Sequence, residues 1–147
     1  MKVFVIGGVA AGTKTAAKLK RENRDAEVTI LTKDKDISYA GCGLPYYVGN
    51  LIETREELVV NTPAKFAGLT GVTVHTNREA VSLDPASKTL QAKNLETNET
   101  ETYSYDRLVI ATGASPVIPP IPGTDKKGVF KMRTPDDAVS MRSYIET

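Results

Sequence analysis

The sequence has one cysteine, Cys42, one histidine, His75, and no long apolar run. A single cysteine cannot form an internal disulfide, and a lone thiol suits a reducing compartment. No segment approaches the roughly 20 apolar residues that a membrane span requires, and no signal-peptide pattern precedes the first apolar stretch. These absences predict a cytoplasmic protein.

The sequence also has no large excess of charge of either sign. The 19 basic and 18 acidic residues leave a net charge of +1, so the composition indicates neither a nucleic-acid nor a membrane partner. The 147 residues suffice for one domain with a buried core. We assign no metal ligands, and His75, which lies at an expected strand away from every motif, is given a structural role.

The order of strand and helix patterns predicts an α/β fold. Residues 2–6 are typical of a strand buried on both faces of a parallel sheet. A glycine-rich turn, a helix over 11–23 and a strand over 27–31 complete a βαβ unit of about 30 residues. Residues 34–50 are expected to form a loop. The remaining expected elements are a helix over 62–67, a strand over 72–75, antiparallel strands over 79–84, 88–95 and 101–105, a buried strand over 108–111, and a helix from Thr134 to the end.

The glycine turn after the first strand carries a candidate phosphate site. Gly7 and Gly12 hold the first and last positions of a G-x-G-x-x-G spacing, with Val9 in the middle. Such glycines let the backbone approach a phosphate, and the following helix points its N-terminus at the anion. The alternative is an ordinary tight turn between a strand and a helix. The position at the start of a βαβ unit favours a dinucleotide cofactor.

The end of the second strand lacks the acid that commonly binds a ribose hydroxyl. Thr32 and Lys33 stand there instead, and Thr32 offers one hydroxyl.

Cys42 lies in a glycine-flanked segment, Gly41-Cys42-Gly43. If Gly43-Leu44-Pro45 begins a helical turn, Cys42 lies at its N-terminus, where free N–H groups favour the thiolate. The alternative is a small buried hydrophobic residue, as many lone cysteines are. The glycines and polar neighbours favour an open, reactive thiol.

Three motifs together resemble the pyridine nucleotide-disulfide oxidoreductases: residues 5–12, 38–47 and 105–113, in that order. The resemblance covers essentially the whole chain and is strongest to the single-cysteine branch of coenzyme A disulfide reductases and NADH oxidases. Two-cysteine relatives have a C-x-x-x-x-C spacing, whereas Tyr47 holds the second position here. The Gly-Leu-Pro-Tyr run after Cys42 is similar to coenzyme A disulfide reductases. Those enzymes usually have Asn before the cysteine, and the side-chain contact of that Asn is absent at Gly41.

The resemblance implies a FAD/NAD(P)-binding Rossmann-like fold of three layers (ββα), with a parallel sheet and an antiparallel β-meander. It makes residues 1–147 the N-terminal segment of the FAD-binding domain, with the NAD(P)-binding and dimerisation domains outside this chain. The complete enzyme is then expected to be a homodimer, and the fragment alone is not expected to turn over. The implied FAD contacts are Gly7, Gly8, Ala11, Gly12, Thr32, Lys33, Ala80, Val81, Ala111, Thr112 and Gly113.

The implied reaction passes electrons from NAD(P)H to FAD, then to Cys42 and to a small-molecule disulfide, either coenzyme A disulfide or a per- or polysulfide. Lys14, Lys18 and Arg21 share one helix face. With Ser38, they are the implied contacts for coenzyme A, although a solvated helix face explains the spacing equally. Two other classes stay open: an NADH oxidase or peroxidase that forms a Cys42 sulfenic acid, and a stand-alone nucleotide-binding module without catalysis.

Overall fold

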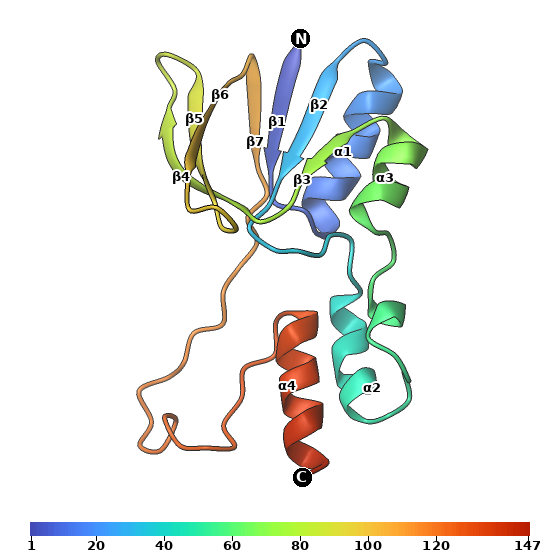
Figure 1. Cartoon of the computed structure of the whole chain (residues 1–147), viewed down its shortest axis with the longest axis vertical. Helices are drawn as coiled ribbons and strands as arrows, with labels where there is room; N and C mark the ends of the chain where they lie inside the picture. Colours follow the sequence, from blue (N-terminus) through green and yellow to red (C-terminus); the bar gives the residue numbers. More distant parts are fainter. The chain divides into compact units, whose positions relative to one another are not determined.

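The chain folds into two units, and the computed structural model describes all of residues 1–147 (Figure 1). Unit 1 comprises Met1–Ser38 and Asn61–Gly113, and unit 2 comprises Tyr39–Val60 and Ala114–Thr147. None of the helices combines the length and apolar character that a membrane crossing demands.

Unit 1 is built on a parallel sheet with strand order β3-β2-β1-β7. Two helices and a three-stranded antiparallel meander, ordered β4-β5-β6, complete it. The strand and helix bounds are β1 Lys2–Ile6, α1 Ala10–Glu22, β2 Glu27–Leu31, α3 Pro63–Thr70, β3 Thr73–His75, β4 Arg78–Asp84, β5 Thr89–Asn94, β6 Thr100–Ser104 and β7 Arg107–Ile110.

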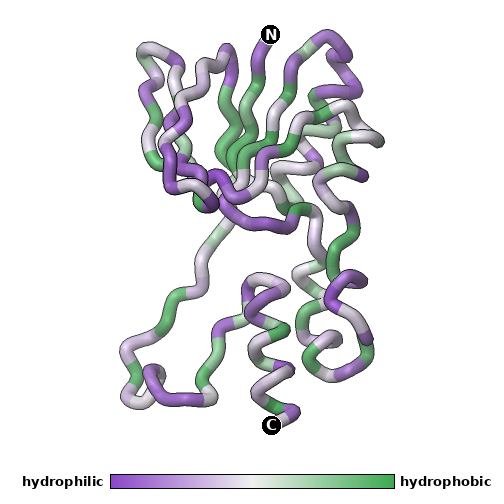
Figure 2. Tube along the Cα trace, viewed as in Figure 1, coloured by the Kyte–Doolittle hydropathy of each residue, from purple (hydrophilic) through white to green (hydrophobic).

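Alternating side chains of β1 form the cores on the two faces of the sheet. Val3 and Val5 belong to a buried cluster with Ala16 of α1 and Phe66 of α3. Phe4 and Ile6 belong to a second cluster with residues of the meander, Leu90 and Ala92. Because helices cover one face and the meander the other, β1 is apolar throughout, and Figure 2 shows hydrophobic residues along the central strands. The predicted three-layer fold is confirmed.

The boundaries of α3 have local causes. The Thr62 side chain accepts a hydrogen bond from the Lys65 N–H at 3.2 Å, and Pro63 fills the first helical position. The helix continues to Thr70, past the predicted end at residue 67, because Gly71 supplies the left-handed conformation (φ 71°) that ends it.

Unit 2 has its own small core, and the prediction of a loop over 34–50 is partly wrong there. This stretch contains a 3₁₀ turn, η1 Gly41–Gly43, and a short helix, α2 Leu44–Val48; η2 Glu56–Leu58 and α4 Pro135–Ile145 follow. Leu44, Tyr47, Leu58 and Ala138 form the buried cluster. The predicted start of α4 at Thr134 is confirmed by a reciprocal capping box with Asp137.

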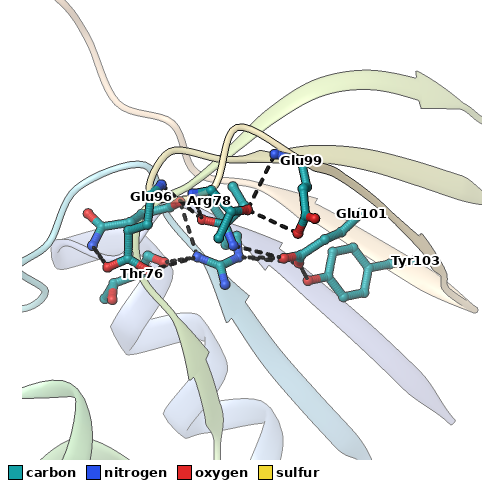
Figure 3. Close-up of polar contacts among 9 residues, drawn as sticks. Thr76, Arg78, Glu96, Glu99, Glu101 and Tyr103 are labelled. Carbon is teal, nitrogen blue, oxygen red and sulfur yellow. Dashed lines mark hydrogen bonds and ion pairs between the residues drawn. The ribbon is translucent and has the colours of Figure 1, made fainter.

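A polar network fixes the start of β4 to β6 in the meander (Figure 3). Arg78 Nε donates to the Glu101 carboxylate at 3.0 Å, and its Nη1 donates to the Thr76 carbonyl at 3.2 Å. Glu101 also accepts from the Tyr103 hydroxyl. The Tyr103 ring lies on Phe4 of β1, with centroids 5.1 Å apart. The network therefore joins the meander to the parallel sheet.

We predict that Tyr103 in this network ionises at a higher pH than a free tyrosine. Burial, and then the hydrogen bond to Glu101, raise the pKa of Tyr103 from 10.0 to about 12. The protonated phenol therefore stabilises the fold below pH 10, and this contribution is lost as the pH rises to about 12. Denaturant unfolding of the native chain and the Tyr103→Phe variant, compared between these pH values, should show the native chain losing more stability. A pH-independent difference between the two would contradict the assignment.

Candidate functional site

The carboxyl ends of the four parallel strands lie at one edge of the sheet in unit 1. Gly7 and Gly8 follow β1, Thr32 follows β2, and Ala111 follows β7. Ligands of open α/β sheets bind at this edge. The structure therefore brings together residues from three separate segments that the sequence predicts to contact a cofactor.

Close backbone contacts explain the glycines of this turn. A Cβ on Gly12 would lie 1.8 Å from the Gly7 carbonyl oxygen, and a Cβ on Gly7 would lie 2.2 Å from the Ala111 carbonyl oxygen. Gly7 also has a φ of +115°, which side chains rarely adopt. The first turn of α1, the glycine turn and the exit of β7 are thus in direct backbone contact.

The N-terminus of α1 has no side-chain cap, since Val9 supplies none. Its first intrahelical bond runs from the Thr13 N–H to the Val9 carbonyl at 3.0 Å. The N–H groups of Ala10, Ala11 and Gly12 therefore precede the helical ladder, and Ala11 is exposed. Uncapped N–H groups on a helix of this length, beside a glycine turn, suit a phosphate or pyrophosphate.

Thr32 and Lys33 differ in what they can offer. Thr32 is buried, its N–H donates to the His75 carbonyl at 3.0 Å, and its carbonyl accepts from the Arg78 N–H at 2.9 Å. Lys33 is exposed. The Thr32 side chain lies against Gly8, where an added Cβ would come within 3.0 Å of it.

Ala80 and Val81 lie on β4 at an irregularity in its pairing with β5. The register shifts between Ala80 and Ser82, which leaves Val81 as the extra residue of a bulge. Val81 is 53% exposed, whereas Ala80 packs on the core shared by the sheet and the meander. Bulges commonly redirect side chains at binding sites.

The predicted coenzyme A contacts are also in unit 1. Lys14, Lys18 and Arg21 are all exposed on α1. Lys18 pairs with Glu22 at 2.5 Å, so part of its charge is neutralised. Ser38 donates its N–H to the Gly8 carbonyl at 2.8 Å, which fixes it to the glycine turn.

Cys42 lies in unit 2, on the turn η1, and it is exposed. The interpretation of a buried hydrophobic cysteine is therefore wrong. The Gly43 N–H donates to the Ala40 carbonyl at 2.9 Å, and the Ala40 N–H donates to the Leu58 carbonyl at 2.7 Å. The helical turn expected after Gly43 is present as α2.

The two glycines beside Cys42 have different roles. A Cβ on Gly43 would lie 3.2 Å from Ile52 and 3.3 Å from Leu58, so Gly43 lets the turn pack on the core of unit 2. A Cβ on Gly41 would meet nothing within 4 Å. One flank of the thiol is therefore held by packing, and the other is open.

Arg142 contacts the segment after Cys42, although no sequence pattern predicts this contact. Its Nη1 donates to the Tyr47 carbonyl, 95 positions earlier in the chain. A basic residue near the end of a helix carries no local signal for so distant a partner.

Comparison with known proteins agrees with this arrangement. The family model described as pyridine nucleotide-disulphide oxidoreductase matches residues 1–146. An NADH oxidase of Methanocaldococcus jannaschii is 36% identical, and a coenzyme A disulfide reductase of Staphylococcus haemolyticus is 34% identical, each over 99% of this chain. The solved structure of an NAD-dependent persulfide reductase from A. fulgidus is 37% identical over 99% of this chain and 27% of its own, with a TM-score of 0.92.

This chain spans 32% of the length of each of the two curated relatives. The family match nevertheless extends over nearly every residue, and it includes the glycine turn, the Cys42 turn and the exit of β7. The chain belongs to the pyridine nucleotide-disulphide oxidoreductase family.

Proposed function

We propose that this chain is the FAD-binding and thiol-bearing part of an NAD(P)H-dependent disulfide oxidoreductase in which Cys42 is the redox-active residue. The exposed position of the sole thiol, on a turn with one open flank, carries the proposal. Family membership and the close backbone contacts at the glycine turn support it.

The residues at the sheet edge fit FAD. Gly7, Gly8 and Gly12 would leave the main chain free to approach the pyrophosphate, and the N–H of Ala11 would face an anion. The ribose and adenine contacts would fall to Thr32, Lys33, Ala80 and Val81, and Ala111, Thr112 and Gly113 would line the remaining length. When bound, FAD supplies a carrier for two electrons between a nicotinamide and a thiol–disulfide pair.

We predict that Gly12→Ala weakens FAD binding by more than tenfold. The new methyl group would lie 1.8 Å from the Gly7 carbonyl oxygen and force the helix away from the turn. Gly68→Ala is the matched control, because a Cβ there meets nothing within 4 Å. FAD titration followed by flavin fluorescence measures the affinity, and circular dichroism checks the fold of each variant. Equal affinity for both variants would contradict a site at this turn.

The chemistry proposed for Cys42 is thiol–disulfide exchange. Its thiolate attacks one sulfur of the substrate, a bond forms between Cys42 Sγ and that sulfur, and the other half leaves as a thiolate. Two electrons, which NAD(P)H would ultimately supply, then cleave the mixed disulfide and restore the Cys42 thiolate. A substrate sulfur would approach along the flank that Gly41 leaves open.

The substrates proposed are coenzyme A disulfide and per- or polysulfides. The identities of 34% to a coenzyme A disulfide reductase and 37% to a persulfide reductase support both classes. The missing side chain at Gly41 favours the smaller per- or polysulfides, whereas the basic stripe of Lys14, Lys18 and Arg21 favours the phosphates of coenzyme A.

An NADH oxidase or peroxidase is the second candidate function, supported by the relative of that name at 36% identity. In this case, peroxide transfers one oxygen to the Cys42 thiolate, giving a sulfenic acid and hydroxide.

The two chemistries predict different products on Cys42. With coenzyme A disulfide, we expect a mixed disulfide and one released coenzyme A thiol for each chain, because the chain has one cysteine. Intact-mass spectrometry and free-thiol titration measure both, and Cys42→Ser is the blank. Faster loss of the thiol with peroxide than with coenzyme A disulfide or polysulfide, at equal concentrations, would favour the oxidase and count against the reductase.

A further prediction concerns the basic stripe of Lys14, Lys18 and Arg21. Lys14→Ala and Arg21→Ala should each slow the exchange with coenzyme A disulfide by roughly two- to fivefold at low salt, since exposed charges contribute about 0.2–1 kcal/mol each. Lys18→Ala should have a smaller effect because Glu22 already pairs with Lys18. The exchange with polysulfide should not change, and the effects should fade as salt is added. Lys65→Ala, an exposed cation on α3, is the control. Equal effects on the exchange rates with both substrates would indicate that the stripe is only a solvated helix face and does not bind coenzyme A.

A further inference from the structure

The Arg142 side chain joins α4 to the segment that follows Cys42 in unit 2. Its Nη1 donates to three main-chain carbonyls, those of Glu53 at 3.0 Å and of Tyr47 and Ile52 at 3.4 Å each. Its Nε donates to Glu146 at 3.0 Å. The side chain is only 21% exposed, so these bonds are partly shielded from water.

The same guanidinium covers the ring of Tyr47. Arg142 Cζ lies 4.7 Å from the ring centroid, within the range of a cation–π contact. Tyr47 is 9% exposed and packs with Leu44, Leu58 and Ala138. Tyr47 holds the position that two-cysteine relatives give to their second cysteine, and here it serves as the anchor of α2 on α4.

The orientation of Cys42 depends on α2. The thiol is exposed, and its turn is continuous with α2, which has only five residues. A helix that short is not stable by itself, so its order comes from packing and from groups that satisfy its terminal carbonyls. The Tyr47 carbonyl accepts from the Asn50 N–H at 3.2 Å, and Arg142 adds a second donor from α4 and places positive charge at the C-terminal end of the helix.

We propose that Arg142 is a positioning residue for Cys42: by holding α2 and the following loop to α4, it keeps the thiol in one orientation. Any effect of this positioning on catalysis rests on the proposed redox role of Cys42. The positioning itself can be measured without any reaction.

A matched control lies in the same unit. Arg55 makes a two-bond contact with Asp136 at the start of α4, at 3.2 and 2.8 Å, and its side chain is 24% exposed. This pair also joins the segment 39–60 to α4, but Arg55 lies at the N-terminal end of η2 rather than at the end of α2. Because η2 reaches the Cys42 turn only through Leu58, the loss of the pair should affect that turn less than the loss of Arg142.

The experiment is nitroxide labelling of Cys42, followed by electron paramagnetic resonance of the 147-residue chain. Since Cys42 is the sole cysteine, the label reports this turn alone. We expect Arg142→Ala to raise the ratio of mobile to immobile label about tenfold, equivalent to about 1.4 kcal/mol. Arg142→Lys should give a partial increase, because an ammonium lacks the planar group that serves three carbonyls and the ring. Arg55→Ala should raise the ratio clearly less than Arg142→Ala does.

An unchanged ratio in a folded Arg142→Ala chain would overturn the proposal, as would an equal increase in Arg55→Ala. If Arg142→Ala does not fold, Arg142→Lys decides, and an unchanged ratio in that variant is the contrary result. Exchange of the unlabelled chain with coenzyme A disulfide separates this proposal from the proposed function. A mobile label in Arg142→Ala together with a native exchange rate would confirm the positioning and show that it does not affect the reaction. Absence of exchange in the native chain would overturn the proposed function but not the positioning.

Discussion

The contact between the first turn of α1 and the Gly7 carbonyl is the constraint on which unit 1 depends. No side chain fits at Gly12, because its Cβ would lie 1.8 Å from that oxygen. The contact sets how closely α1 packs on the sheet, and through Gly7 it reaches the exit of β7, which is also in backbone contact. The close approach of the first turn of α1 to the glycine turn, and of that turn to the exit of β7, is thus one that only glycine at these two positions allows.

Much of unit 1 could be predicted from the sequence, because its signals are local. An apolar run that is covered on both faces, a glycine spacing and a threonine-proline helix start each act over a few residues, and β1, the glycine turn and α3 lie where these signals indicate. The end of α3 was harder to predict, since the pattern of residues 62–67 carries no information about Gly71, which ends the helix.

Unit 2 was harder to predict because its contacts join distant segments. Leu44 and Ala138 share one small core, yet neither lies in a long periodic pattern. The helix α2 is too short for periodicity to reveal it. The partners of Arg142 in unit 2, and of Arg78 in unit 1, could not be predicted either, because the fold and not the sequence spacing determines them. Motifs therefore indicate the residues proposed to bear the chemistry, whereas the residues that hold these segments in place depend on the fold.

The lone thiol on a turn with one open flank has a consequence for timing. In the proposed exchange, no second thiol of this chain could attack the mixed disulfide on Cys42. The half-substrate would then stay attached until electrons arrived from outside the turn. While it is attached, the sulfur is protected from irreversible oxidation to the sulfinic or sulfonic acid. Under the proposed function, a shortage of reductant would thus leave Cys42 in a mixed disulfide that can still be reduced, and the attached half-substrate would act as a protecting group for the thiol.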